Sequence, residues 1–191
     1  MNFLEELISE WYEYKGYFVR QNVKVGKRDN GGYAGELDIV AFNPVTKHLV
    51  HIEPSSDTDK WEKRERRYKK KFDLGRKYIP DLFKGIKIPN KIEQQAVFLW
   101  GGKTQKLLGG GNVLLLVDYF KIINNEISQK KTNKEIVPEN LPLIRTLHLF
   151  IDNLEKIQDD NLITPITKPG RRKATTDNIK LKKIKKKARI N

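Results

Sequence analysis

The chain of 191 residues contains no cysteine, which excludes disulfide bonds and thiolate metal sites. It has no apolar run approaching the roughly 18 residues that a membrane-spanning helix needs. The first residues, Met-Asn-Phe-Leu-Glu-Glu, lack the basic and apolar segments of a signal peptide. We therefore expect a cytoplasmic protein without a membrane partner.

Two common site patterns are also missing. The glycine-rich stretch 101–111 does not end in the Gly-Lys-Ser/Thr of a phosphate-binding P-loop. The three histidines, His48, His51 and His148, are not spaced as zinc ligands. The sequence therefore indicates neither a nucleotide-binding loop nor a zinc site.

Negative charge is outweighed: 24 Asp and Glu stand against 38 Lys and Arg, and the formal net charge is +14. Residues 168–191 hold eleven Lys and Arg side chains against one acid, Asp177, which predicts a polyanionic partner. The composition after Pro165 predicts disorder, so we expect a domain at 1–165 and a basic tail at 166–191. A tail that only aids solubility, or that binds RNA without specificity, would have the same composition.

The most informative stretch is a predicted β-hairpin. Two apolar, β-branched runs, 36–42 and 49–54, flank a connector that contains Asn and Pro. If the hairpin is symmetric, residue i pairs with residue 91 − i, so Asp38 lies opposite Glu53. Directly opposed side chains share a face at about 4.5–5.5 Å, where two carboxylates repel and Mg²⁺ would relieve the repulsion. A register slip of one residue would place them on opposite faces.

Residues 35–41, Gly-Glu-Leu-Asp-Ile-Val-Ala, precede a strand that ends in Glu-Pro-Ser at 53–55. This pattern resembles the PD-(D/E)XK, or restriction-endonuclease-like, nuclease superfamily, over roughly the first eighty residues. The resemblance implies that Asp38 and Glu53 bind Mg²⁺ or Mn²⁺. Leu37 stands where the motif name has Pro. Ser55 stands where the family has the Lys that assists the attacking water, and displaced Lys residues occur in the family.

The beginning of the chain fits the same family. Apolar positions between residues 2 and 15 recur at helical spacing, and Gly16 ends the pattern. Many members begin with such a helix and then a strand, and in several a Glu of the helix reaches the metal site. The resemblance implies this role for Glu5, with Glu6 and Glu10 as fallback candidates. An acid in a first helical turn also simply favours the helix dipole.

A basic helix is predicted at 58–79, with one buried stripe that includes Trp61 and Phe72. Ten basic side chains against four acids suit phosphate contacts, although ion pairs on a solvated face would account for part of the pattern. We expect its first turns to supply the missing ammonium, from Lys63 or else Lys60. The residues expected to bind nucleic acid, including two from the glycine-rich loop 27–35, are Lys27, Arg28, Lys60, Arg64, Arg67, Lys70 and Lys71.

The remaining patterns complete the fold. Strands are expected at 17–25, 91–100 and 112–117, and helices at 119–129 and 142–157. The order predicts an α/β fold of the restriction-endonuclease-like type, with a mixed β-sheet flanked by helices on both faces. His51 is expected on a strand, on the same face as Glu53, where it would flank the site.

The sequence thus predicts a Mg²⁺-dependent DNA endonuclease, with a role in restriction or repair left open. The predicted catalytic residues are Asp38, Glu53, Ser55, Glu5 and Lys63. One alternative is a catalytically inactive nucleic-acid-binding protein with the nuclease fold, because Ser55 replaces the Lys. A third reading is an interaction protein whose basic tail targets RNA. The sequence leaves a homodimer open.

Overall fold

The structure, a computed structural model, describes residues 3–101, 105–130 and 134–159. The chain divides into two compact units, Met1–Asp152 and Asn153–Asn191. The second unit is described over residues 153–159, which contain helix α5 (Leu154–Asp159). The tail expected at 166–191 and the domain boundary expected at residue 165 lie outside the described residues.

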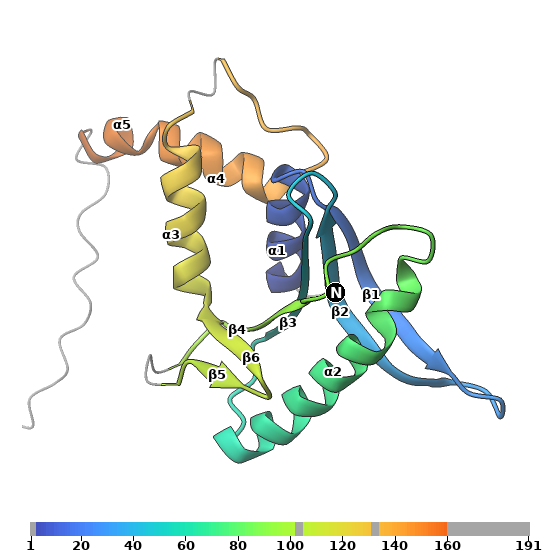
Figure 1. Cartoon of the computed structure of the whole chain (residues 1–191). Helices are drawn as coiled ribbons and strands as arrows, with labels where there is room; N and C mark the ends of the chain where they lie inside the picture. The colour runs from blue at the N-terminus through green and yellow to red at the C-terminus, as the bar shows by residue number, and fades with distance from the viewer. Residues whose placement is uncertain (1–2, 102–104, 131–133, 160–191) are drawn as a thin grey trace, which may run out of the picture. The chain divides into compact units, whose positions relative to one another are not determined.

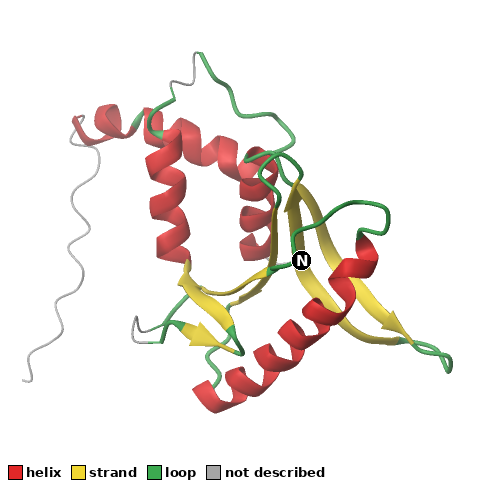
Figure 2. Cartoon of the chain, viewed as in Figure 1, coloured by secondary structure: helices red, strands yellow, loops and turns green. Residues whose placement is uncertain are grey.

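The first unit begins with a helix, three strands and a second, long helix (Figures 1 and 2). Its helices are α1 (Phe3–Tyr14), α2 (Trp61–Leu82), α3 (Leu116–Ile127) and α4 (Pro142–Asp152). Its strands are β1 (Phe18–Lys27), β2 (Tyr33–Asn43), β3 (His48–Ser55), β4 (Glu93–Phe98), β5 (Leu107–Leu108) and β6 (Gly111–Leu115).

Six strands form one mixed sheet in the order β1-β2-β3-β4-β6-β5. β1, β2 and β3 are antiparallel neighbours, β3, β4 and β6 run parallel, and β5 is antiparallel to β6. Two parallel strands need a long crossover, and α2 lies within the one that joins β3 to β4. The helices lie on both sides of the sheet (Figure 1), so the predicted mixed α/β class is confirmed.

The β2–β3 hairpin has the register that symmetry predicts, because Ile39 pairs with Ile52 and Ala41 with Val50. Its connector is held by Asn43, whose Oδ1 accepts hydrogen bonds from the backbone N–H groups of residues 45 and 46 at 2.9 and 3.0 Å. An Asn side chain that bonds its own following backbone is a common turn device. The connector therefore fixes the register on which the position of the two carboxylates depends.

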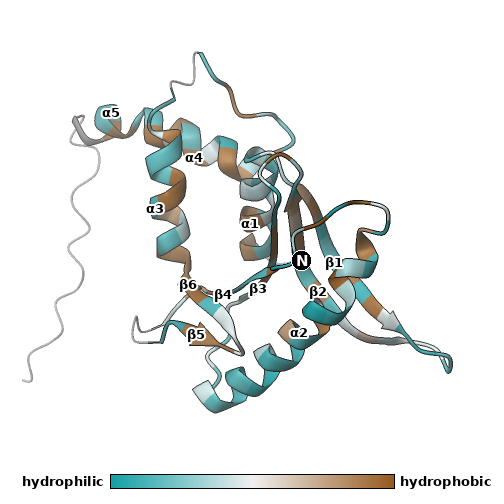
Figure 3. Ribbon diagram, in the orientation of Figure 1, coloured by the Kyte–Doolittle hydropathy of each residue, from teal (hydrophilic) through white to brown (hydrophobic). Residues whose placement is uncertain are grey.

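The two faces of the sheet carry different helices. On one face, α1, α3 and α4 pack on Ile39, Val50 and Val97. On the other face, residues of α2 and of the segment after it pack on Val40, Phe42, Leu49 and Phe98. Figure 3 shows hydrophobic residues along the inner strands and a largely hydrophilic α2. Only a narrow stripe of α2 is apolar, so its charged residues surround the part that packs on the sheet.

Helix α2 differs from its predicted bounds at both ends. It begins at Trp61 because residues 55–60 form a polar turn, in which Asp57 accepts from the backbone N–H of Asp59 at 3.0 Å. It continues past its predicted end at residue 79, through Pro80, to Leu82. Proline is accepted there because the helix ends within one turn, where the N–H of residue 83 bonds Pro80 O at 3.3 Å.

Several other bounds differ from expectation, including those of β1, β4 and α3. The loop expected at 27–35 is shorter, because Lys27 pairs with Tyr33 and only residues 28–32 form the hairpin tip. The strand expected at 112–117 ends at Leu115, where Asp118 Oδ2 accepts the backbone N–H of that residue at 3.1 Å and starts α3. The last predicted helix, 142–157, is divided at residue 153 into α4 and α5.

Candidate functional site

Asp38 and Glu53 lie side by side on neighbouring antiparallel strands. Asp38 precedes Ile39 and Glu53 follows its partner Ile52, so the two acids lie directly beyond the last pair of the ladder. The backbone N–H of Asp38 lies 3.3 Å from Glu53 Oε1, to which it donates. The structure thus brings together the two carboxylates that the sequence singles out.

Both carboxylates lie on the face that α2 covers. Further along β2, Val40 packs in the cluster beneath α2, and so does Leu37, although the two residues are an odd number of positions apart. The alternation of β2 therefore changes near Asp38. Asn22, at this level of the neighbouring strand β1, has a left-handed φ of 52°. Leu37 packs in the cluster beneath α2 and Asp38 contacts Lys71, so both residues approach this helix.

The side chain that joins the two carboxylates is Lys71 of α2. Its Nζ donates to Asp38 Oδ1 and Oδ2 at 2.8 Å each and also contacts Glu53 Oε2. The side chain of Glu53 is 1% exposed, that of Asp38 16% and that of Lys71 29%. Three charged groups from three elements thus form one partly buried cluster, which we call the acid–lysine cluster.

The prediction that Lys63 or Lys60 supplies this ammonium was wrong. Lys63 Nζ instead pairs with Asp59 at 2.9 Å on the surface, and Lys60 is exposed just before α2 begins. The turn at 55–60 carries the chain past the strand ends, and α2 then runs back across the sheet. Lys71 follows Lys63 by eight residues, about 12 Å along a helix, which brings it above the carboxylates.

Ser55, in the position of the family Lys, belongs to the polar turn. Its hydroxyl donates to Asp57 Oδ2, and the backbone N–H of Asp57 donates back to Ser55 Oγ at 3.2 Å. Asp57 also accepts from Arg64 Nε at 3.0 Å and from Arg67. Burial raises the pKa of Asp57, but these hydrogen bonds outweigh it, and its pKa lies well below the usual value. Ser55 thus ties the end of β3 to α2.

His51 and Gln94 support Glu53 from inside the protein. His51 is fully buried, and its Nε2 lies 2.7 Å from Glu53 Oε1. Its Nδ1 lies 3.3 Å from Nε2 of Gln94, which also donates to the backbone carbonyl of Phe72 at 2.9 Å. The expectation that His51 flanks the carboxylates from a strand therefore agrees with its place in the structure.

The protonation states follow from burial and charge. Burial, supported by the Glu53 carboxylate and opposed by the Lys71 ammonium, raises the pKa of Asp38 to about 7. Burial lowers the pKa of Lys71, but the Glu53 and Asp38 carboxylates outweigh it, and its pKa is raised. Burial lowers the pKa of His51 to about 3. At neutral pH, Lys71 is therefore a cation, His51 is neutral, and Asp38 is near the midpoint of its titration.

The acids of α1 lie on a different helix layer. Leu4 and Ile8 pack α1 against the sheet face opposite to α2. Glu5 is in the first turn of this helix, and its catalytic role remains a prediction. Glu10, a fallback candidate, has a structural role: its Oε2 accepts the backbone N–H groups of Leu143 and Ile144 at 2.8 and 3.0 Å, at the start of α4.

Several of the residues expected to bind nucleic acid have partners within the protein. Arg64 is 8% exposed, bonds Asp57 and lies 4.3 Å from the centre of the Phe98 ring. Arg67 donates to Asp57 and Asp59, so its guanidinium is held within the protein. Lys71 belongs to the acid–lysine cluster. These three cations stabilise the fold and the cluster in the structure.

The hairpin tip is also distant from the carboxylates. Lys27 pairs with Tyr33, five residues before Asp38, which is about 17 Å along a strand. Arg28 belongs to the tip beyond this pair, so contact of either side chain with a phosphate would be made well away from the carboxylates. Exposed cations also lie on the outer face of α2, where a shallow groove of about 420 Å³ is lined by Arg66, Lys69, Lys70, Asp73, Leu74 and Lys77.

The donor set of the cluster suits a hard divalent cation. Mg²⁺ usually takes one or two protein carboxylates, with water and substrate phosphate in its other positions. Asp38 and Glu53 already enclose a positive group, the Lys71 ammonium. Among the residues that the structure describes, no group of three or more His, Cys, Asp or Glu side chains is arranged around one point. Two carboxylates are thus the protein ligands that this cluster offers.

A comparison of the chain with models of protein families and with curated proteins finds no match. Within the described residues, the helices are all too short or too polar to span a membrane.

Proposed function

We propose that the chain is a divalent-cation-dependent DNA phosphodiesterase of the PD-(D/E)XK type. The observation that carries this proposal is the acid–lysine cluster: two carboxylates on neighbouring strands and one ammonium, on one face of the sheet. These are the three charged groups that the motif implies, although the lysine comes from α2. The observed mixed sheet with helices on both faces is compatible with a restriction-endonuclease-like fold.

In this proposal Asp38 and Glu53 hold Mg²⁺ or Mn²⁺, which would polarise the scissile phosphate and lower the pKa of the attacking water. The two carboxylates can hold a metal only if the Lys71 ammonium withdraws from between them. Lys71 then remains next to the bound phosphate as a cation. As an ammonium it can donate hydrogen bonds to the phosphate oxygens and attract their negative charge.

The outer face of α2 would hold the DNA backbone. Arg66, Lys70 and Lys77 are exposed there, while Lys69 lies 3.8 Å from Asp73. Phosphate contacts of this kind give affinity and orientation without reading sequence. This assignment replaces Arg64 and Arg67, whose guanidinium groups are held by Asp57.

A second function is favoured by one specific observation. The Lys71 ammonium already balances both carboxylates, and Ser55 is engaged in the turn. A protein in which lysine permanently takes the place of the metal would keep the fold and bind nucleic acid without cleaving it. This is the inactive nuclease-fold alternative.

The discriminating experiment is plasmid cleavage with Mg²⁺ or Mn²⁺ by the parent, Asp38→Asn, Lys71→Met and the matched control Lys63→Met. Lys63 is on the same helix, but its partner is the surface residue Asp59. The nuclease proposal expects cutting by the parent and by Lys63→Met, and a loss of at least a hundredfold in the other two. If the parent binds DNA yet leaves the plasmid intact with either metal, the alternative is correct.

A further inference from the structure

The buried groups behind Glu53 form one continuous chain of hydrogen bonds. Arg76 donates to Gln94 Oε1, Gln94 Nε2 lies 3.3 Å from His51 Nδ1, and His51 Nε2 lies 2.7 Å from Glu53 Oε1. Gln94 is 6% exposed, His51 0% and Glu53 1%. The chain thus runs from a cation at the surface to one oxygen of a buried carboxylate.

The direction of each bond follows from groups whose roles cannot vary. Arg76 can only donate, and the Phe72 carbonyl can only accept. Gln94 must therefore present Oε1 to Arg76 and its NH₂ to Phe72 O, at 2.9 Å, and to His51. His51 Nδ1 is then an acceptor, so the proton of the neutral ring is on Nε2 and is donated to Glu53.

Helix α2 holds the imidazole ring in place. A Cβ atom at Gly75 would lie 2.3 Å from His51 Nδ1, so only glycine lets the helix approach the ring this closely. The Phe72 ring meets the imidazole edge to face, with centroids 5.4 Å apart. The same helix that carries Lys71 therefore also fixes the orientation of His51.

We infer that His51 and Gln94 are positioning residues that hold the Glu53 carboxylate with Oε1 bound inside the protein and Oε2 directed at the cation position. The Lys71 ammonium contacts Oε2 at that position. Partners of this kind fix the orientation of a ligating group and raise its affinity for metal. The inference deepens the proposed function, because it assigns residues that prepare one of its two metal ligands.

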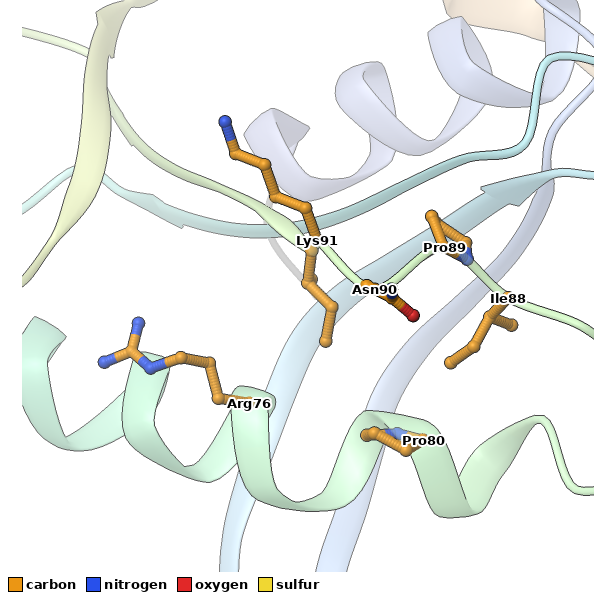
Figure 4. A pocket seen from close by; sticks show the side chains of 7 residues that line it. Arg76, Pro80, Ile88, Pro89, Asn90 and Lys91 are labelled. Atoms are coloured by element: carbon orange, nitrogen blue, oxygen red, sulfur yellow. The ribbon is translucent and has the colours of Figure 1, made fainter.

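The surface end of the chain opens into a cavity. Arg76 and Pro80 of α2 line one side of it, and residues 88–91, which lead into β4, line the other (Figure 4). The cavity has a volume of about 590 Å³. Arg76 also donates to Asp73, so its guanidinium is held by two partners while it orients Gln94.

The test compares the parent with His51→Leu, His51→Gln and Gln94→Leu. Glutamine restores a donor near the position of Nε2, while leucine removes it. The matched control is His148→Gln, which alters a second buried histidine, one that bonds the backbone carbonyl of Lys130 at 2.8 Å. Mn²⁺ affinity is measured by calorimetry. NMR gives the tautomer of the His51 ring and the chemical shift of the Glu53 carboxyl carbon.

We expect the neutral Nε2–H tautomer for His51 in the parent. Mn²⁺ affinity should fall about tenfold to a hundredfold in His51→Leu and by a smaller factor in Gln94→Leu. It should recover at least in part in His51→Gln and stay unchanged in His148→Gln. An Nδ1–H tautomer, or equal Mn²⁺ affinity in parent and His51→Leu, overturns the inference.

Failure of the proposed function is distinguishable from failure of this inference. A parent that binds no Mn²⁺ refutes the metal-dependent function. The positioning of Glu53 is then judged from the metal-free protein. We expect the chemical shift of the Glu53 carboxyl carbon to change in His51→Leu and to return toward the parent value in His51→Gln. Identical shifts in the parent and in His51→Leu would show that His51 does not position Glu53.

Discussion

Replacing Lys71 by Met tests whether its ammonium occupies the place of a cation. Methionine keeps most of the length of the side chain and removes the charge, so Asp38 and Glu53 would face each other without a partner. Removing one member of a buried ion pair costs about 3–5 kcal/mol. Because Lys71 is 29% exposed and Asp38 can take up a proton, we expect about 2–3 kcal/mol at pH 8.5.

The cost should depend on pH in a defined direction. Burial already raises the pKa of Asp38 to about 7, and the ammonium opposes this rise. Without Lys71 the pKa of Asp38 must rise further, so at pH 6 the folded variant carries a protonated Asp38 and little repulsion. The loss of stability in Lys71→Met, measured as the decrease in its free energy of unfolding relative to the parent, should therefore be larger by at least about 1 kcal/mol at pH 8.5 than at pH 6.

Urea unfolding at pH 6 and pH 8.5, with and without Mg²⁺ or Mn²⁺, measures this effect. A cation that takes the vacated place should stabilise Lys71→Met by about 2.7 kcal/mol at a hundredfold excess over its dissociation constant. The matched control Lys63→Met should keep the urea midpoint of the parent with and without metal. Equal losses at both pH values, together with no response to either metal, would refute the reasoning.

Three further predictions concern other parts of the structure. Replacing Gly by Ala ordinarily stabilises a helix interior by about 1 kcal/mol. Gly75→Ala should instead lower the melting temperature, because the new Cβ would lie 2.3 Å from His51 Nδ1. An unchanged or higher melting temperature would contradict this packing. Arg64→Lys should lower the free energy of unfolding in urea by about 1–2 kcal/mol without a specific loss of DNA affinity, because Arg64 bonds Asp57. Weaker DNA binding at unchanged stability would instead support the predicted contact of Arg64 with phosphate. Deletion of residues 168–191 should weaken DNA binding and flatten its salt dependence while the melting temperature is kept; equal affinity at low salt would show that the tail is not involved.

Most of the sheet could be predicted from local sequence signals. The β2–β3 register follows from a symmetric connector, and Asn43 realises it by bonding the backbone of the turn. The buried stripe of α2, including Tyr68, Phe72 and Ile79, follows from helical spacing. These signals are local, because they depend on residues within one hairpin or one helix. The separation of Asp38 and Glu53 is set by one such hairpin, so the sequence identifies this pair.

The partners of the carboxylates could not be found in this way. Lys71 is 18 residues from Glu53 in the chain, and Gln94 is 43 residues from His51. Their positions depend on where α2 begins and on how closely it approaches the sheet. The turn at 55–60 delays the helix, and Gly75 allows its close approach over His51. Neither feature has a periodic signal, although Gly75 within a buried helical stripe indicates a close contact.

The position of the lysine has a consequence for how the cluster responds to a cation. An ammonium on the same strand as Glu53 would be fixed by the pleat of that strand, whereas Lys71 reaches the carboxylates from a helix through a flexible stem of four carbons. It can therefore withdraw from Asp38 and Glu53 without any change in the sheet that aligns them. His51 continues to hold Glu53 Oε1 during such a change, because its bond is on the other oxygen. The arrangement thus separates a group that can move, Lys71, from groups that must stay, and this is the property that exchange of an ammonium for a metal ion requires.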